Sequence, residues 1–201
     1  MATDRSTRTP RVRAKADRQA ALLREAARLF AARGFDGVSL EDLGAAVGVT
    51  GPAIYRHFAS KQALLGAILV RVSEELLDGG RAVEAETPAP AERLDRLIAY
   101  HVDFALSGAD VIRVQDRDLP SLSEQDRRTV RTLQRAYVGV WVETLADLRP
   151  ESSPDELRVR ALASFGLINS TPYSLRGGPR PLPDQAVRGI LESMARAALT
   201  V

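Results

Sequence analysis

The sequence predicts an all-helical chain of about nine helices, divided into a small N-terminal domain of three helices and a larger C-terminal helical domain. Three observations lead to this prediction. Alanine, leucine, arginine and glutamate, which favour helices, dominate the composition. Apolar residues recur at spacings of three and four along one segment after another. Capping residues and glycine or proline breaks separate those segments.

The first residues of the chain carry basic side chains without an apolar period, so residues 1–15 are expected to form a flexible arm. The arginines of this arm are Arg5, Arg8, Arg11 and Arg13. Such an arm either lies along DNA, with an arginine in the minor groove, or only keeps the chain soluble, and both interpretations stay open. The first helix is expected from about Asp17 to Arg33, where Gly34 ends it.

The next segment, residues 39–61, has the pattern of two short helices joined by a tight turn. Ser39 and Asp42 have the spacing of a capping box, and an apolar face follows them. Gly48 is placed to end the first short helix in a left-handed conformation. Thr50 is placed to cap the second one. The segment therefore predicts a helix-turn-helix.

The outward side of the second short helix mixes small, phenolic, guanidinium and imidazole side chains. Arginine can bond guanine, alanine can touch a thymine methyl group, and tyrosine, histidine and lysine can bond phosphates. Such a face suits the edge of a DNA groove better than a protein core. The candidate DNA-binding residues are Ser39, Thr50, Gly51, Pro52, Ala53, Tyr55, Arg56, His57 and Lys61.

This part of the chain closely resembles the TetR/AcrR family of bacterial transcriptional regulators. The matching segments are Arg33–Phe35, Ser39–Leu43, Ala46–Val49, Gly51–Phe58 and Ser60–Leu65. The resemblance implies a helix-turn-helix DNA-binding domain over residues 16–62 and an effector-binding and dimerisation domain over residues 63–201. It also implies a ligand-responsive regulator, in most of the family a repressor, that binds a double-stranded, pseudo-palindromic operator as a homodimer and is released by a small-molecule effector.

The charge of the chain is unevenly distributed. Residues 1–61 hold eleven Lys and Arg against six Asp and Glu, whereas residues 62–201 hold seventeen against twenty. Basic charge is thus gathered on the half that carries the helix-turn-helix, as DNA binding requires. A non-specific DNA-architectural protein, one alternative function, is expected to be basic throughout, and this chain is not.

Six helices are expected beyond the helix-turn-helix. Their ranges are about Ser60–Asp78, Ala91–Leu106, Ala109–Arg117, Ser123–Leu148, Pro154–Ser174 and Asp184–Leu199. Gly79 and Gly80 are expected to end the first of these, with a surface connection over residues 81–90. The last two helices have more apolar surface than one small domain needs, and the resemblance implies that they pair with their copies in a dimer. The alternative, that these faces are buried within one subunit, stays open.

A ligand pocket needs apolar walls and a few convergent polar groups, and the central helices supply both. The candidates are Phe104, Arg113, Gln115, Tyr137, Trp141, Phe165, Asn169 and Tyr173. Each also has a structural interpretation: the aromatic residues as core, and Asn169, expected in mid-helix, as a partner of a backbone carbonyl. His101, on an apolar stripe, is expected to be a hydrogen-bonded core residue. The segments 113–116 and 173–178 look like those of actinobacterial relatives that respond to acyl-CoA thioesters, so the effector is expected to be an acyl-CoA or another lipophilic metabolite.

Residues that enzymes need are scarce in this chain. It has two histidines and no cysteine, and it shows no phosphate-binding loop and no paired metal-ligand spacing. We therefore expect no catalytic site, no metal and no cofactor, and an acyl-thioester-processing enzyme is the least favoured alternative. The chain also lacks a signal-like apolar run and any segment near the length of a membrane span, so a cytoplasmic protein without membrane contact is expected.

Overall fold

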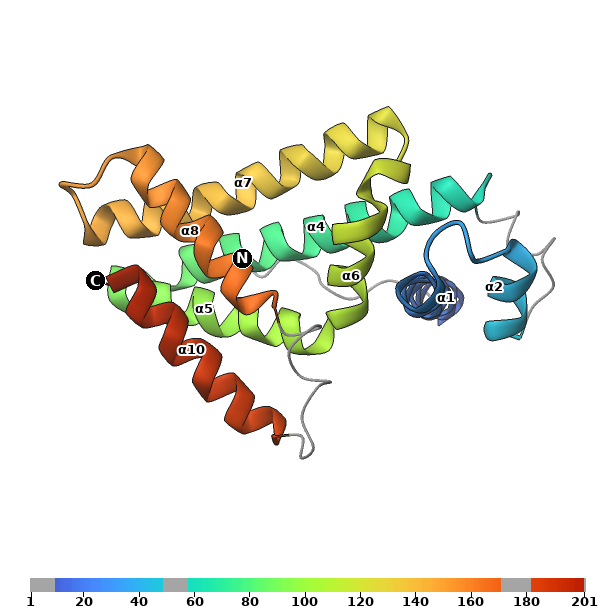
Figure 1. The fold of residues 1–201 in the computed structure, drawn as a ribbon, viewed down its shortest axis with the longest axis horizontal. Helices are drawn as coiled ribbons and strands as arrows, with labels where there is room; N and C mark the ends of the chain where they lie inside the picture. The colour runs from blue at the N-terminus through green and yellow to red at the C-terminus, as the bar shows by residue number, and fades with distance from the viewer. Residues whose placement is uncertain (1–9, 49–57, 171–181, 201) are drawn as a thin grey trace.

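A computed structural model of the chain describes residues 10–48, 58–170 and 182–200 (Figure 1). Over these residues the fold is all-α, with eight α-helices, one 3-10 helix and no strand. The expected nine helices include one over residues 50–58, most of which lies outside the described residues, so the total number stays a prediction.

The helices form a small N-terminal part and a larger second part, joined by one long helix (Figure 1). The N-terminal part contains α1 (Pro10–Arg33) and α2 (Leu40–Ala46). Helix α4 (Lys61–Glu86) begins there and runs alongside α7 into the second part. The second part contains α5 (Pro90–Ser107), α6 (Ala109–Asp118), the 3-10 helix η1 (Leu119–Ser121), α7 (Glu124–Leu148), α8 (Pro154–Ile168) and α10 (Asp184–Thr200).

Two hydrophobic cores correspond to the two parts. The first core packs α1 and α2 against the beginning of α4, and the second packs the end of α4 against α5, α7, α8 and α10. Helix α6 contributes to both, because Ile112 belongs to the second core and Val114 to the first. The two parts therefore share a packed junction at α6.

The predicted cap at Ser39 and the predicted helix ends at Gly34 and Gly48 are confirmed, whereas the cap predicted at Thr50 lies outside the described residues. Ser39 and Asp42 form a capping box at the start of α2, with the Ser39 amide donating to Asp42 Oδ2 at 2.9 Å and the Asp42 amide donating to Ser39 Oγ at 3.0 Å. The Ser39 amide, as the strongest cause, lowers the pKa of the Asp42 carboxyl. Gly34 and Gly48 have φ angles of 81° and 70°, the left-handed region in which glycine is favoured. These local features fix where α1 and α2 end.

Helix α1 begins at Pro10, earlier than the expected Asp17. Proline fits the first helical position, because its missing N–H has no intrahelical partner there, and the alanines that follow favour the helix. The expectation of a flexible arm is therefore wrong for residues 10–15, which are helical, while residues 1–9 lie outside the described residues.

Helix α4 does not stop at Gly79 and Gly80, which corrects the prediction. It continues to Glu86, so most of the expected surface connection is helical. A Cβ on Gly79 would lie 2.1 Å from Cζ of Tyr100, and one on Gly80 would lie 2.8 Å from Cε2 of Tyr137. The two glycines let aromatic rings of α5 and α7 approach the helix backbone, and this packing offsets their poor helix propensity.

Helix α8 ends at Ile168, before the expected Ser174. Asn169 is thus the C-terminal cap residue and not a mid-helix residue. Its backbone N–H donates to Phe165 O at 2.7 Å. Ser123 and Ser153 cap α7 and α8 through their side chains. Within the described ranges no helix is long and apolar enough to cross a membrane.

Candidate DNA-binding and effector sites

Most of the predicted DNA-binding residues lie outside the described residues. These are Thr50, Gly51, Pro52, Ala53, Tyr55, Arg56 and His57. The structure describes the frame on either side of them. Helix α2 ends at Ala46, and Phe58, at 7% exposure, joins the first core. The DNA contacts of the seven residues stay predictions.

Ser39 and Lys61 are the two predicted DNA-binding residues that the structure describes, and both are engaged within the domain. Ser39 is exposed, and its hydroxyl caps α2. The ammonium group of Lys61 donates to Phe35 O at 2.8 Å and to Val38 O at 3.0 Å, and it lies 4.4 Å from the centre of the Phe35 ring. Lys61 therefore holds the α1–α2 connection against α4, a role that the sequence did not reveal, and its phosphate contact stays a prediction.

Four of the predicted effector residues gather with His101 between α5, α7 and α8. We call this group the aromatic cluster: His101, Phe104, Tyr137, Trp141 and Phe165. The His101 ring contacts the other four, and the Phe165 ring lies 4.5 Å from the His101 ring and 4.9 Å from the Trp141 ring. Trp141 is fully buried, whereas Phe104 and Phe165 are partly exposed, so the cluster reaches the surface beside these two rings.

His101 is buried and hydrogen-bonded, as expected from the sequence. Its Nδ1 lies 3.2 Å from the hydroxyl oxygen of Tyr137. Burial lowers the pKa of His101 to about 4, and the side chain of Asn169 opposes this shift only in part. Burial also raises the pKa of Tyr137. Both side chains are therefore neutral near pH 7.

Four buried polar atoms on α5, α7, α8 and the cap of α8 have no well-aligned hydrogen-bond partner among the described residues. They are His101 Nε2, Trp141 Nε1, Ser164 Oγ and Asn169 Oδ1. Two of them have a polar neighbour, because the side chain of Asn169 shifts the pKa of His101 and the side chain of Trp141 shifts the pKa of Tyr137. Buried polar groups in folded proteins are nearly always paired, so small movements of these side chains, a water or a ligand would complete the bonds. Ser164 was missed by the sequence analysis. The sequence signal that could have found it is its position on the buried face of α8, where Ser164 stands among the apolar residues Leu157, Ala161 and Ile168.

Two other predicted effector residues, Arg113 and Gln115, are not brought into this group. Arg113 lies on α6, pairs with Asp110 at 3.5 Å, and lines a surface hollow with Arg28 and other residues of α1. It faces the N-terminal part because its neighbours Ile112 and Val114 occupy the buried sides of α6. Gln115 is partly buried further along α6, and Tyr173 lies outside the described residues.

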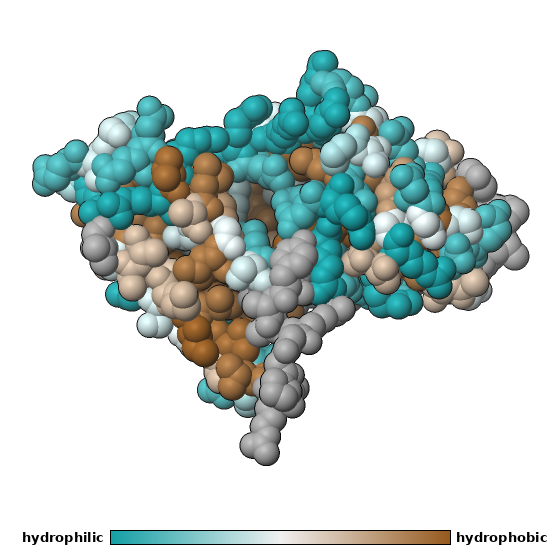
Figure 2. Space-filling view, viewed as in Figure 1, coloured by the Kyte–Doolittle hydropathy of each residue, from teal (hydrophilic) through white to brown (hydrophobic). Residues whose placement is uncertain are grey.

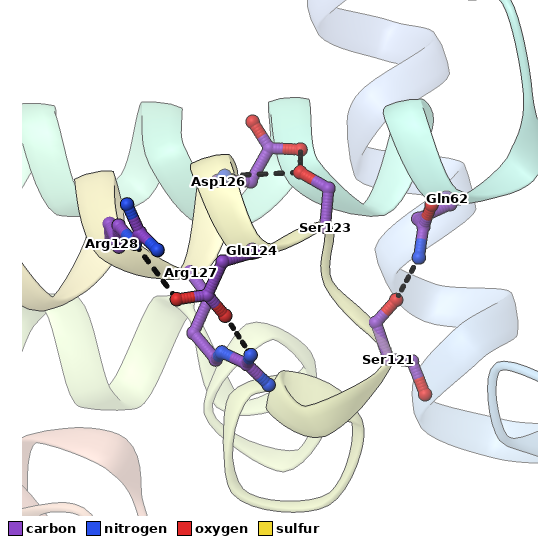
Figure 3. Close-up of polar contacts among 7 residues, drawn as sticks. All are labelled: Gln62, Ser121, Ser123, Glu124, Asp126, Arg127 and Arg128. Carbon is purple, nitrogen blue, oxygen red and sulfur yellow. Dashed lines mark hydrogen bonds and ion pairs between the residues drawn. The ribbon is translucent and has the colours of Figure 1, made fainter.

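Polar contacts fasten the junction between the two parts. On α6, the guanidinium group of Arg117 donates to Phe30 O at the end of α1 and pairs with the buried Asp118, with Nε 2.9 Å from Asp118 Oδ1. Gln62 of α4 donates to Ser121 O at 2.9 Å, next to the Ser123 cap of α7 (Figure 3). Helix α6 follows α5 directly through Gly108, so one continuous segment connects the aromatic cluster to α1.

Comparisons with known proteins agree with this arrangement. The family model described as "Bacterial regulatory proteins, tetR family" matches residues 22–68, and "Tetracyclin repressor-like, C-terminal domain" matches residues 87–177. The HTH-type transcriptional regulator EthR of Mycolicibacterium smegmatis is 34% identical over 176 residues, which cover 84% of this chain and 81% of that protein. The chain belongs to the TetR family. It is a DNA-binding transcriptional regulator and not an enzyme.

Two further relatives of this TetR-family chain bear on its function. The HTH-type transcriptional activator FasR of the same organism is 31% identical over 88% of this chain and 80% of that protein. The crystal structure of AibR in complex with isovaleryl coenzyme A and operator DNA superposes with a TM-score of 0.73 over 88% of this chain and 97% of that one. Its 22% identity shows a common fold. TetR-family regulators bind operator DNA and small-molecule effectors, typically as dimers.

Proposed function

We propose that this TetR-family chain is a homodimeric repressor that binds a pseudo-palindromic operator and leaves it when a lipophilic effector binds the aromatic cluster. The observation that carries this proposal is the aromatic cluster, which reaches the surface at Phe104 and Phe165 and whose His101 and Trp141 each carry a buried nitrogen without a well-aligned hydrogen bond. A pocket with apolar walls and a few polar groups is the usual form of a small-molecule site.

An acyl-CoA thioester is the first candidate effector. AibR, which shares the fold, has been crystallised in complex with isovaleryl coenzyme A and operator DNA. The aromatic cluster of this chain offers apolar rings to an acyl group, and it opens to the surface at the partly exposed Phe104 and Phe165. A charged coenzyme A moiety would then stay outside, where water and surface arginines can stabilise it.

The packed junction offers a route from effector to DNA. An effector that displaces Phe165 or Phe104 moves α8 or the end of α5, and α6 begins directly after α5. Because Arg117 ties the end of α6 to the end of α1, a shift of α6 repositions the N-terminal part, which carries the helix-turn-helix. The two reading units of the dimer then lose the spacing that the operator requires.

Apolar faces of α8 and α10 support the homodimer. Val159 and Leu162 on α8 and Ile190 and Met194 on α10 are exposed in the single chain. Figure 2 shows apolar side chains gathered over these two helices. Helices α8 and α10 also contact each other, so the four side chains belong to one region. We propose that this region pairs with its copy in a four-helix interface.

Gel shifts with the DNA upstream of the chain's own gene, and with a scrambled duplex, test the proposed function. We expect retardation of the upstream DNA alone, and its loss on addition of octanoyl-CoA. Equal retardation of both duplexes would instead support a DNA-architectural protein. FasR is named an activator, so activation is the second candidate direction, and transcription from the bound promoter in vitro decides between the two. We place this activity in the cytoplasm, where bacterial operators lie.

A further inference from the structure

A cavity of about 190 Å³ lies between α1, α4 and α6, where the two parts of the chain meet. We call it the junction cavity. All three helices supply apolar walls, which are Leu23 and Ala27 of α1, Ile68 and Val72 of α4, and Val111 of α6. The junction cavity shares no residue with the aromatic cluster, which lies on α5, α7 and α8. A ligand of this cavity therefore occupies a site of its own.

The sequence explains why the space between these helices is left open. The α1 residues that line the cavity recur at spacings of three and four, so they share one face of the helix: Ala20, Leu23, Arg24 and Ala27. The same spacing brings four residues of α4 to the opposite wall: Ile68, Arg71, Val72 and Glu75. Helices α1 and α4 contact each other, but the two alanines are too small to fill the space between them.

Three exposed, charged side chains form the rim of the junction cavity: Arg24, Arg71 and Glu75. Nε of Arg71 lies 2.7 Å from Oε1 of Glu75, so these two charges largely neutralise each other. Among the described residues Arg24 has no hydrogen-bond or ion-pair partner. The cavity thus combines an apolar interior with one uncompensated positive charge at its rim.

These charges and this volume define the ligand that fits. A guanidinium group binds a carboxylate through two parallel N–H···O bonds, and Arg24 is available for them. A dianion such as a phosphate monoester is disfavoured, because the Glu75 carboxylate belongs to the same rim. A cavity of about 150 Å³ holds benzene, so the junction cavity has room for one ring or a branched chain of similar size.

We propose that the junction cavity binds a small monocarboxylic acid, with its ring or branched chain between α1 and α4 and its carboxylate on Arg24. Such a ligand contacts the N-terminal part through α1 and the second part through Val111 of α6. Its binding therefore stabilises the present arrangement of α1 against α4 and α6. This site does not depend on the effector site proposed for the aromatic cluster.

Fluorine NMR titrations of the full chain with two probes of equal shape test the proposal. The probes are 4-fluorobenzoate and 4-fluorobenzamide at pH 7.5, which differ in the negative charge. We expect the benzoate to bind about fivefold more tightly, because only the anion pairs with Arg24 and this pair is exposed to solvent. Equal affinities of the two probes, or no binding of either, would overturn the proposal.

Three charge variants make opposite predictions for the affinity of 4-fluorobenzoate. Arg24→Gln should weaken it about fivefold, to that of the amide. Glu75→Gln should strengthen it about threefold, because Arg71 loses its partner and becomes a second cation for the ligand. Arg28→Gln is the matched control and should leave it unchanged, since Arg28 pairs with Glu25 and lies outside the cavity.

Either of two results with these variants would refute the carboxylate site. An equal loss in Arg24→Gln and Arg28→Gln would show a general attraction of the anion to positive charge. Unchanged or weaker binding in Glu75→Gln would show that the carboxylate does not lie at this rim.

Filling the cavity tests its role directly. Ala20→Leu places a larger side chain in the space and keeps a good helix former, and both probes should bind at least about tenfold more weakly. Full affinity in a folded Ala20→Leu variant would overturn the proposal, and the charge variants decide the matter if circular dichroism shows that it unfolds. Hydrogen exchange locates the probe: 4-fluorobenzoate should slow exchange in α1 and α4. Slowing in α7 and α8 alone would place it in the aromatic cluster and refute the junction site.

Discussion

Lys61 shows how a single side chain can serve the frame of a DNA-binding domain. Its ammonium donates to two carbonyls of the α1–α2 connection, so Lys61→Met removes both bonds and keeps the aliphatic stem. We expect the free energy of unfolding to fall by about 2 kcal/mol, since bonds to charged donors are worth about 1.5–3 kcal/mol when partly buried. Urea unfolding measures this loss, and an unchanged midpoint would contradict the structural role.

The salt dependence of DNA binding separates that role from a phosphate contact of Lys61. If the third N–H of the Lys61 ammonium also reaches DNA, the magnitude of the slope of log affinity against log salt concentration decreases by about 1 in Lys61→Met. If Lys61 is purely structural, Lys61→Met lowers the free energy of unfolding and leaves this slope unchanged.

His101 makes stability depend on pH. Burial lowers its pKa to about 4 from 6.5, so the folded state binds fewer protons than the unfolded state between these values. The stabilisation is complete above about pH 6.5 and is lost as the pH falls towards 4, by up to about 3 kcal/mol. Urea unfolding at pH 7, 6 and 5 measures it. In His101→Gln the free energy of unfolding should change less between pH 6.5 and 5 than in the unaltered chain. An unchanged pH dependence in that variant would contradict a neutral buried imidazole.

At the scale of residues, the sequence predicted aromatic and capping positions better than polar roles. Trp141 and Tyr137 were predicted as pocket or core residues, and both lie in the aromatic cluster. Arg113 was expected there and instead faces α1, because the direction of a side chain on α6 depends on two neighbouring cores that periodicity does not reveal. Ser164 was missed because a serine in an apolar stripe resembles a tolerated small residue.

Glycines within helices show the same limit at the scale of elements. Gly79 and Gly80 were interpreted as a stop, because local propensity disfavours glycine in a helix. Their packing role depends on α5 and α7, because the Tyr100 and Tyr137 rings of these helices occupy the space that a Cβ would need. Helix ends set by local caps, such as those at Ser39 and Gly34, were predicted correctly because no distant residue is involved.

Replacing Gly80 and Gly139 by alanine tests this explanation. Gly80→Ala brings a Cβ within 2.8 Å of the buried Tyr137 ring, which is stacked with His101 and Phe165 and cannot easily move. We expect a loss of about 1–3 kcal/mol, despite the better helix propensity of alanine. Gly139→Ala is the control, because nothing lies within 4 Å of its added Cβ, and it should gain up to about 1 kcal/mol. Equal shifts of the two urea midpoints would refute the packing role of Gly80.

Helix α6 is the element expected to transmit the effector signal. Arg117→Ala removes the contacts to the end of α1 and leaves the buried Asp118 without that cation. Affinity for octanoyl-CoA should stay within about twofold, since no residue of the aromatic cluster changes, while the effector-induced loss of operator affinity shrinks by about tenfold or more. Calorimetry gives the first quantity and gel shifts the second. A full effector response in this variant would show that the signal takes another route.

At the scale of the whole molecule, the sequence predicted the division into a DNA-binding part and a larger helical part from its charge and its motif. It could not predict how the parts are joined, because the contacts of Arg117 with Phe30 and of Gln62 with Ser121 join residues that are remote in sequence and meet only in the folded chain. The apolar excess of the last two helices was visible in the sequence. The sequence did not show whether one subunit buries these apolar faces. In the structure, large apolar side chains on α8 and α10 are exposed.

Those exposed side chains lead to a prediction about assembly. Leu162 and Met194 are 45% and 51% exposed in the single chain, and in the proposed interface each would be buried against a copy of α8 or α10. Leu162→Glu and Met194→Glu place unpaired carboxylates in that contact and should yield monomers, as measured by sedimentation equilibrium at micromolar concentration. Thr132→Glu adds the same charge to an exposed position of α7 and should remain dimeric.

Operator binding should follow assembly, because a monomer contacts one half-site and loses the contacts of the second. We expect about a hundredfold weaker operator binding for the two α8 and α10 variants and unchanged binding for the α7 control, since each half-site supplies several contacts of about 1–3 kcal/mol. Dimers that persist in both variants would place the interface elsewhere. Monomers that bind the operator at full strength would show that one helix-turn-helix suffices, and the symmetric operator would then have no physical basis.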